Sequence, residues 1–343
     1  MSRRLLSVRN LKTSFFTHVG EVKAVRGISF DLNQGEVLGI VGESGSGKSV
    51  TSLSILQLLI HYAKIEPGSE INFEGKNLAS MNKKEMRKVR GKDIAMIFQD
   101  PMTSLNPVYT VGNQIVEMIL EHEKMTKAQA RERAIEMLRL VGIPSPEKRI
   151  HNYPHEFSGG MRQRAMIAMA LACSPKLLIA DEPTTALDVT IQAQILNLIK
   201  ELNHKLDMTT ILITHDLGVV ATLCDKVAVM YGGLIMEDAS ADDIFYHPQH
   251  PYTMGLIDSI PRVTGGEKQR LKPIPGTPPN LINPPKGCPF SARCPYCMNV
   301  CQEEMPPYFT DGEHRTMCWL LDDEAPANPD YEKRKGGTRR VDG

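Results

Sequence analysis

Two groups of residues in this sequence have types and spacings that could do chemistry. The first is the glycine-rich GESGSGKS at residues 42–49, in which a lysine and a serine follow closely spaced glycines. Glycines let the backbone turn its N–H groups toward phosphates, the lysine reaches the terminal phosphates, and the serine hydroxyl can ligate magnesium. The second is a crowd of cysteines between residues 288 and 318. Thiolates at such short spacings could hold one soft-metal centre, which this crowding favours over a secreted disulfide framework.

The glycine-rich motif has the neighbours that a phosphate site requires. The apolar VLGIV before it is typical of a buried strand, and the VTSLSILQLL after it is typical of a helix. A strand, a glycine-rich turn and a helix in this order form the context in which the motif binds nucleotides, whereas a chance glycine-rich turn needs neither neighbour. We therefore predict a nucleotide-binding loop, the P-loop, from Gly42, Ser44, Gly45, Ser46, Gly47, Lys48, Ser49 and Val50.

An acidic pair follows a second apolar strand. KLLIADEP places Asp181 at the carboxyl end of that strand, where ligands gather in open α/β sheets. Asp181 could hold magnesium, directly or through water, and Glu182 could polarise the water that attacks the terminal phosphate. Such a pair by itself is as often a solvated turn, but the P-loop upstream favours catalysis.

The order of apolar segments predicts an α/β chain. Short apolar runs (VLGIVG, IAMIF, KLLIAD, TTILITHD) alternate with amphipathic stretches such as VTIQAQILNLIKELNHKL, as in buried strands with crossover helices. The strand signal disappears over about residues 101–160, where VGNQIVEMILEHE and KAQARERAIEMLRLVG predict an inserted helical subdomain. Gly232 and Gly233 predict a tight hairpin. We expect a main domain over residues 1–260 and a proline-rich extension over 261–343, with EKRKGGTRRVDG at its end as a solvated tail.

Composition limits the class of partner. Forty Lys and Arg balance forty Asp and Glu, so no overall positive field attracts nucleic acid. The first residues lack the apolar core of a secretory signal, and no apolar run reaches about 18 residues, the length that spans a bilayer. We expect a soluble, cytosolic chain with no nucleic-acid partner.

With these motifs in place, the chain resembles the ATPase subunit of an ABC transporter over residues 1 to about 235. Besides the P-loop, FSGGMRQR (residues 157–164) resembles the signature motif, IFQDP the Q-loop, TALD (residues 185–188) the D-loop and ITHD the switch-histidine motif. The resemblance implies an α/β P-loop NTPase (RecA-like) nucleotide-binding domain, with an antiparallel β subdomain and an inserted helical subdomain, followed by an irregular extension.

The resemblance also implies roles for individual residues. Catalysis is implied for Glu182, His215 and Gln99, magnesium binding for Ser49, Gln99 and Asp181, and adenine stacking for Phe15, for which the neighbouring Phe16 could substitute. Ser158, Gly159 and Gly160 would bind ATP held by a partner subunit, because the family pairs two ATPase domains head to tail. As a simple physical reading, Ser158 can cap a helix whose first turn is open to phosphate. A core position for Phe15 and a structural role for His215 are the alternatives.

The C-terminal sequence resembles one subfamily of these ATPases in particular. HPQHPYTMGLIDSIP and IPGTPPNLINPPKGCPFSARC resemble the extension of dipeptide and oligopeptide importer ATPases. Their cysteine pattern corresponds here to Cys288, Cys294, Cys301 and Cys318, which implies a [4Fe-4S] cluster; zinc on four thiolates is the chemical alternative. Cys297 is an addition to the pattern, either a replacement for Cys318 or a spare thiol. For His247 and His250, which lie beside prolines, a turn is favoured over metal ligation.

The implied partners are a second ABC ATPase subunit, usually giving a heterodimer, two membrane permeases and an extracytoplasmic peptide-binding protein. The chain would then be peripheral on the cytoplasmic side of the inner membrane, with its permease docked near Gln99, DPMTSLNP and the inserted helices. Other functions left open are a soluble ABC ATPase acting on ribosomes or DNA, a motor for nickel or glutathione import, and an ATPase whose cysteines act as a redox sensor.

Overall fold

The computed structural model describes residues 3–100, 104–185, 187–260 and 273–335. The chain divides into two compact units. We call the helical unit the one made of Met1–Leu5, Leu32–Val37 and Ser80–Ile213, and the loop unit the one made of Leu6–Asp31, Leu38–Ala79 and Thr214–Gly343.

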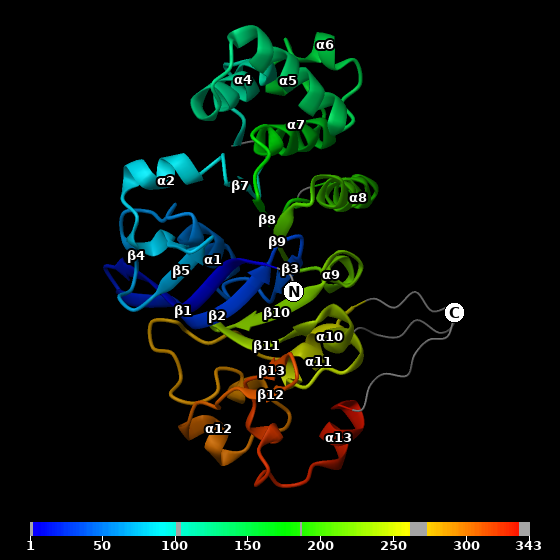
Figure 1. The fold of residues 1–343 in the computed structure, drawn as a ribbon. Helices are drawn as coiled ribbons and strands as arrows, with labels where there is room; N and C mark the ends of the chain where they lie inside the picture. The colour runs from blue at the N-terminus through cyan, green and yellow to red at the C-terminus, as the bar shows by residue number, and fades with distance from the viewer. Residues whose placement is uncertain (1–2, 101–103, 186, 261–272, 336–343) are drawn as a thin grey trace, which may run out of the picture. The chain divides into compact units, whose positions relative to one another are not determined.

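The helical unit contains the inserted helices. These are α2 (Lys83–Val89), α4 (Val111–His122), α5 (Lys127–Leu140), α6 (Pro146–Arg149) and α7 (Gly159–Leu171), and α4, α5 and α7 lie together in Figure 1. Thr110 and Thr126 cap α4 and α5 with their hydroxyls, and both helices turn alanine, valine or isoleucine side chains toward their neighbours, such as Ile115 and Ala134. The predicted helical subdomain is therefore made of capped amphipathic helices.

Parallel strands position the acidic pair in the same unit. Strand β8 (Leu177–Asp181) pairs in parallel with β7 (Ile94–Ile97) on one side and with β9 (Thr209–Thr214) on the other. Every residue of β8 and β9 is buried, as expected for strands covered on both faces. Helix α8 (Val189–Leu206) is capped by Asp188 and coincides with the predicted VTIQAQILNLIKELNHKL.

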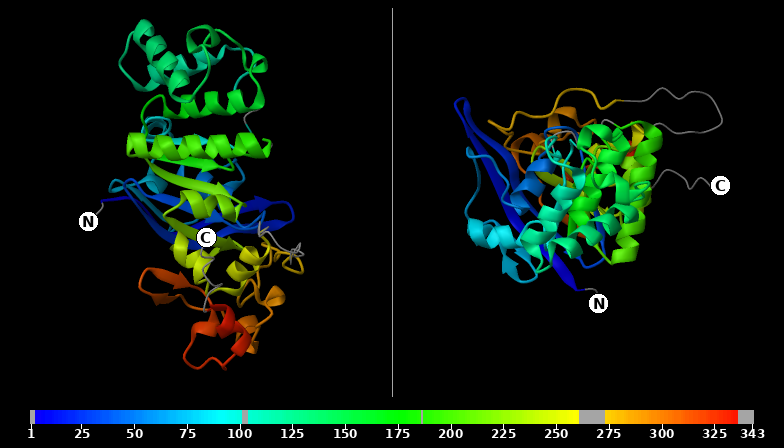
Figure 2. Two further views of the ribbon diagram at one scale, coloured as in Figure 1. Left: turned by 90° about the vertical axis from the view of Figure 1, so that its right-hand side faces the viewer. Right: turned by 90° about the horizontal axis from the view of Figure 1, so that it is seen from above.

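The loop unit contains an antiparallel sheet. Its long strands β1 (Arg4–Thr17) and β2 (Gly20–Asn33) run side by side as the dark-blue ribbons of Figure 2. Strand β1 also pairs with β4 (Ala63–Ile65) and β5 (Glu70–Phe73), and β5 pairs with β6 (Lys76–Asn77). Helix α1 (Lys48–Ile55) follows β3 (Val37–Val41), so the strand and helix predicted around the P-loop are confirmed, although the helix ends earlier than the text VTSLSILQLL indicated.

Five hydrogen-bonded strands of the loop unit connect β3 to the C-terminal region. Within the larger sheet they run in the order β12 (Phe309–Asp311), β13 (His314–Thr316), β11 (Leu234–Ser240), β10 (Lys226–Tyr231) and β3. Gly232 and Gly233 join β10 to β11 with φ of 56° and 80°, which confirms the predicted hairpin. Because β13 pairs with β11, part of the expected extension continues the sheet of the main domain.

Short helices complete the loop unit. They are α9 (Leu217–Leu223), α10 (Ala241–Tyr246), α11 (Pro251–Asp258), α12 (Asn299–Glu303) and α13 (Pro329–Lys335). Met254, Cys318, Leu320 and Tyr331 form a hydrophobic cluster of their own. The first part of the predicted solvated tail, residues 332–335, is helical and belongs to α13, which packs through the buried ring of Tyr331, and residues 336–343 lie outside the described residues. In the described part of the chain, no helix is long and apolar enough to cross a membrane.

Candidate functional site

Close backbone packing explains the glycines of the P-loop. A Cβ on Gly42 would lie 2.1 Å from the carbonyl oxygen of Met230, and one on Gly47 would lie 2.5 Å from that of Ala24. Both residues also have positive φ, 148° and 102°, where side chains are strained. Glycine is thus required at these two positions, and the loop leads directly into α1, with Gly47 as the residue before its first turn.

The polar groups of the P-loop suit an anionic ligand. Lys48 is buried, and its Nζ donates to the carbonyl oxygens of Gly42 at 2.8 Å and Glu43 at 3.0 Å. Phosphate oxygens are acceptors of the same kind, and an ammonium has three N–H donors, so these two carbonyls hold Lys48 and leave it able to donate to a phosphate as well. The hydroxyl of Ser46 is buried with no hydrogen-bond partner among the described residues. An unmatched buried hydroxyl is costly, and a phosphate oxygen would relieve that cost.

Aromatic residues lie on the predicted adenine side of the loop unit. Phe15 is half-buried on β1, and its ring centroid is 6.0 Å from that of Tyr62. Tyr62 is 42% exposed, and Phe16 is 46% exposed with Lys64 over its ring. Tyr62, which the sequence marked only as an aromatic residue shortly after the P-loop helix, thus lies beside the predicted adenine-stacking residue Phe15.

The structure brings Gln99 and Glu182 together in the helical unit. Asp181 is the buried last residue of β8, and Glu182 follows it in a left-handed conformation with φ of 45°. The Glu182 carboxylate accepts hydrogen bonds from Gln99 Nε2 and from Thr185 Oγ1, each at 2.9 Å. Its N–H donates to the carbonyl of Ile213 on β9. The orientation of this carboxylate is therefore fixed by the end of β8, by the backbone contact to β9 and by the side chains of Gln99 and Thr185.

The signature segment has the cap that its sequence predicted. Ser158 is exposed, and its hydroxyl accepts from the N–H of Met161, so it caps α7. Gly159 is exposed as well. A Cβ on Gly160 would lie 2.9 Å from Cγ2 of Ile191 on α8, so a side chain there would require Ile191 to move. The helix start thus combines an open surface with a close contact behind it.

The other predicted site residues are divided between the two units. His215 is exposed between β9 and α9, and belongs to the loop unit together with the P-loop, whereas Asp181, Glu182, Gln99 and Ser158 belong to the helical unit. The predicted D-loop includes Ala186, and the predicted docking segment includes residues 101–103; these lie outside the described residues.

Four of the C-terminal cysteines line one small enclosed cavity, which we call the Cys cavity. They are Cys288, Cys294, Cys301 and Cys318. Burial raises the pKa of Cys288 and of Cys294 to about 12, and also raises those of Cys301 and Cys318. Cys297 is not among the lining residues; its Sγ is 3.5 Å from the carbonyl oxygen of Met298. Within the described residues, no three His, Cys, Asp or Glu side chains are arranged to hold a metal ion.

A buried histidine also lines the Cys cavity. His250 caps α11 through Nδ1, which accepts from the N–H of Tyr252 at 3.0 Å. Burial lowers the pKa of His250 to about 4, so the ring is neutral and its proton must be on Nε2. Nε2 is buried and has no hydrogen-bond partner among the described residues. The favoured turn at His250 is in fact the start of a helix, and a residue that lines the Cys cavity keeps one unmatched donor.

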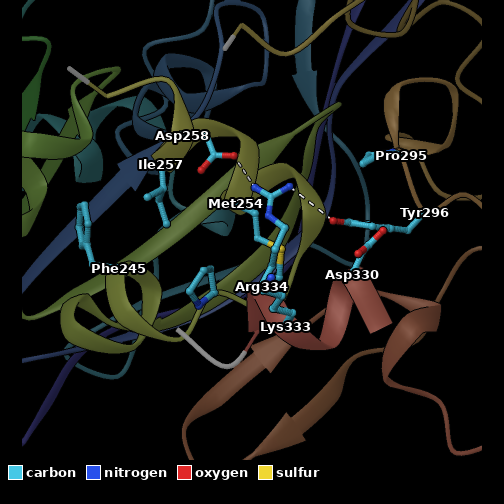
Figure 3. A pocket seen from close by; sticks show the side chains of 10 residues that line it. Phe245, Met254, Ile257, Asp258, Pro295, Tyr296, Asp330, Lys333 and Arg334 are labelled. Carbon is cyan, nitrogen blue, oxygen red and sulfur yellow. Dashed lines mark hydrogen bonds and ion pairs between the residues drawn. The ribbon is translucent and has the colours of Figure 1, made fainter. Parts of the chain in front are cut away.

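Helix α13 closes a groove next to this region. The groove has a volume of about 620 Å³, and Figure 3 shows Arg334 reaching between Asp258 on α11 and Tyr296. Arg334 forms an ion pair of 2.5 Å with Asp258, and Tyr296 lines both the groove and the Cys cavity. The end of the described chain thus covers the loop that carries the cysteines.

The helical unit has a surface groove of its own, which we call the helical groove. Its volume is about 590 Å³. Its lining comes from α2, α4, α7 and the segment before α4: Arg87, Arg90, Asn106, Tyr109, Gln114, Glu117, Met118, Glu121, His122 and Met169. Tyr109 is 55% exposed, and an ion pair joins Arg87 to Glu121 at the rim.

Comparisons with known proteins agree with these features. A model of the ABC transporter family matches residues 25–185, and a model of the oligopeptide/dipeptide transporter C-terminal region matches residues 236–301. The chain is 56% identical to the oligopeptide transport ATP-binding protein OppD of Bacillus subtilis (strain 168), over 98% of this chain and 95% of that protein. It is 58% identical to the dipeptide transport ATP-binding protein DppD of the same organism, over 94% and 96%. For OppD of Escherichia coli (strain K12) the identity is 52%, over 91% and 92%.

Solved structures show the same fold. The dimeric post-hydrolysis state of the ATP-binding cassette MJ0796 bound to ADP and Pi has a TM-score of 0.61 at 26% identity, covering 69% of this chain and 98% of that one. CbiO1 from Clostridium perfringens has a TM-score of 0.60 at 28% identity, covering 71% and 90%. These likenesses confirm the predicted fold class, and the chain is an ABC-type P-loop ATPase. It belongs to the ABC transporter family, within the ATP-binding subunits of oligopeptide and dipeptide transporters.

Proposed function

We propose that this chain is the ATPase subunit that energises import of dipeptides and oligopeptides through separate permease subunits. The observation that carries the proposal is the likeness to peptide-transport ATP-binding proteins along almost the whole chain, including 58% identity over 94% of it. The match to the transporter C-terminal region supports the same cargo class. The subunit would be peripheral on the cytoplasmic side of the inner membrane, and an extracytoplasmic binding protein would deliver the peptide.

For nucleotide binding, we assign Phe15 to the adenine ring and the P-loop to the phosphates. Lys48 would neutralise terminal phosphate charge, while Ser49, Asp181 and Gln99 would hold Mg²⁺. The support is local: the buried Lys48 ammonium among carbonyl acceptors, the unmatched Ser46 hydroxyl, and the required glycines.

For hydrolysis, we assign Glu182 as the group that orients the attacking water and His215 as a contact of the terminal phosphate. The hydrogen bonds from Gln99 and Thr185 hold the Glu182 carboxylate in one orientation, so it need not reorganise during the reaction. Its left-handed backbone is an outlier of the kind that clusters at active sites.

A second ATPase subunit completes the proposed machine, and a heterodimer is the expected form. Ser158, Gly159 and Gly160 would contact the ATP held by that partner. Their support is the exposed, serine-capped start of α7, whose N–H groups and dipole favour an anion.

The helical groove is the proposed permease-docking surface. It combines an exposed tyrosine with charged residues on its rim, a composition that suits an amphipathic segment of a partner protein. Residue Gln99, which contacts Glu182, belongs to the same unit, so docking and the catalytic carboxylate share one framework.

We further propose a [4Fe-4S] cluster held by Cys288, Cys294, Cys301 and Cys318, with zinc as the chemical alternative. Three buried thiols and the half-buried thiol of Cys294 would be stable as thiolates only next to strong positive charge, because desolvation raises their pKa. The unmatched Nε2–H of His250 supports an electron-rich occupant, since cluster sulfur is a hydrogen-bond acceptor. When bound, the cluster would cross-link the loop; Cys297 would remain a spare thiol beside it.

The test is purification of the intact complex under anaerobic conditions. We expect two permeases, a second ATPase subunit and ATP turnover that rises with peptide and binding protein. Tyr109→Ala in the helical groove should reduce recovery of the permeases, while Tyr246→Ala, an exposed tyrosine at the end of α10, should leave it unchanged. Copurification with ribosomes or DNA in place of permeases would reject the proposal.

A further inference from the structure

The C-terminal region forms an ion pair with one residue of the P-loop, Glu43. Arg293 Nη1 lies 2.5 Å from Glu43 Oε2, and Nη2 lies 2.9 Å from Oε1, so the pair is bidentate. The Arg293 side chain is only 4% exposed and that of Glu43 is 28% exposed. A shielded, two-pronged pair of this kind fixes orientation as well as charge.

A second contact from the same region holds the backbone of Glu43. Its N–H donates to the hydroxyl of Tyr252 at 2.9 Å, and Tyr252 is fully buried on α11. The carbonyl of Glu43 accepts from Lys48 Nζ at 3.0 Å. Since its carboxylate, N–H and carbonyl are all engaged, a displacement of Glu43 would also move the lysine that we assign to the phosphates.

Arg293 is itself locked in place. Its Nε donates to the carbonyl of Pro275 at 2.9 Å, Nη2 to that of Ile274 at 3.2 Å, and Nη1 to the Tyr231 hydroxyl at 3.1 Å. The guanidinium lies over the rings of Tyr231 and Phe290, 5.6 and 5.9 Å from their centroids. Because these contacts fix the rotamer of Arg293, its guanidinium can hold the Glu43 carboxylate in one position.

The same short segment borders the Cys cavity. Arg293 directly precedes Cys294, and Phe290, which lies against Arg293, lines the cavity with Cys288 and Cys294. Phe290 also packs on Tyr252, with ring centroids 5.3 Å apart. Residues 288–294 thus have the cavity on one side and the supports of the P-loop on the other.

We infer that Arg293 is a positioning residue for nucleotide binding. Through Arg293, residues 288–294 set the geometry of the P-loop. The inference rests on the proposed role of residues 42–49 in binding ATP. Loss of Arg293 leaves the partly shielded Glu43 carboxylate without its partner, and such a group turns toward solvent or repels a phosphate. The consequence is weaker nucleotide binding at a distance from any residue that touches the nucleotide.

The experiment measures MgATP affinity of the full chain by titration. Arg293→Met and Glu43→Gln should each weaken binding by about tenfold, which corresponds to about 1.4 kcal/mol. The double variant should be no weaker than the poorer single variant, because both remove the same interaction. Arg293→Lys keeps the charge but not the fork, and should fall between wild type and Arg293→Met.

Arg315→Met is the matched control. Arg315 also makes a bidentate pair, with Asp238, and lies over the ring of Tyr308, but it does not touch the P-loop. It should lower thermal stability as Arg293→Met does while leaving MgATP affinity unchanged. If both arginine variants lose stability and neither loses affinity, Arg293 is only structural and the inference is wrong.

Lys48→Ala separates this inference from the proposed site. Wild-type affinity in Lys48→Ala would reject the P-loop assignment itself. Loss of binding in Lys48→Ala, together with wild-type affinity in Arg293→Lys and Glu43→Gln, would reject the positioning role alone. The last two variants decide the question even where Arg293→Met does not fold.

Discussion

At the scale of single residues, Glu182, the proposed catalytic carboxylate, is held in one conformation by the surrounding fold. A glutamate in left-handed backbone costs about 1 kcal/mol or more, and it persists only where the surroundings enforce it. Here the end of β8, the N–H contact to Ile213 and the hydrogen bonds to the carboxylate supply that enforcement. The strain is therefore consistent with a carboxylate that must stay in one place.

Glu182→Gln should leave MgATP binding intact and slow hydrolysis by about 10²–10⁴-fold. The amide keeps the size of the side chain but is a poor base, and it can still accept from Thr185. The measurement is steady-state ATP turnover of the assembled transporter beside direct titration of nucleotide. Full turnover would assign water activation to another group.

The cysteines allow a matched pair of variants. Cys288→Ser removes a thiol that lines the Cys cavity, and Cys297→Ser removes one that is not among its lining residues. Iron content per chain after anaerobic purification should fall strongly for Cys288→Ser and stay at the wild-type level for Cys297→Ser. The reverse pattern would make Cys297 a ligand. Zinc in both proteins, with no iron, would replace the cluster by the alternative metal.

At the scale of elements, helix starts carry much of the site. The P-loop ends in α1 and the signature segment begins α7, and in each case the residue before the helix was visible in the sequence as glycine or serine. Capping and glycine signals are local, so they could be predicted without knowledge of the rest of the chain. Helix α13 was missed because its sequence is charged and short, and because its contacts, the buried ring of Tyr331 and the ion pair of Arg334 with Asp258, are made to distant segments.

Tyr331→Ala should lower the free energy of unfolding by about 3 kcal/mol and release α13. The ring is 1% exposed, packs in the cluster with Cys318, and donates its hydroxyl to the carbonyl of Gln249 at 2.9 Å. Urea unfolding and limited proteolysis near residue 330 would measure both effects. Tyr246→Ala, which removes a tyrosine that is 47% exposed, should change stability by less than about 0.5 kcal/mol.

At the scale of the whole molecule, the residues proposed to bind and hydrolyse ATP are divided between two units of one chain. The P-loop and His215 belong to the loop unit, and Asp181, Glu182, Gln99 and Ser158 belong to the helical unit. Our proposal adds a second subunit, because Ser158 lies at an exposed helix start with an anion-binding character. The expected domain boundary near residue 260 stays a prediction.

Ser158→Asp and Ser158→Asn test the role of that helix start in the assembled transporter. Both residues can cap α7, but aspartate adds a negative charge where the partner's triphosphate is proposed to lie. Relative to the wild type, ATP turnover should fall by about tenfold or more for Ser158→Asp and stay within about twofold for Ser158→Asn. MgATP affinity of the isolated chain should be the same in both. Equal turnover in the two variants would show that no phosphate approaches this helix.

The sequence by itself determined the fold class, the strand and helix around the P-loop, the acidic pair and the cap of α7. These depend on periodicity, glycine and capping residues within a few positions of one another, and such local signals are written along the chain.

Only the tertiary structure decided which distant side chains meet. It joined Arg293 to Glu43, placed Tyr252 under the same loop residue, and left the Nε2 of His250 unmatched beside the Cys cavity. Residues 43 and 293 are 250 positions apart. No local pattern encodes such a pair. It forms only in the folded chain, in which β10 lies beside β3, the strand before the P-loop, and β11 lies beside β10, so that the segment after β11 can reach the P-loop.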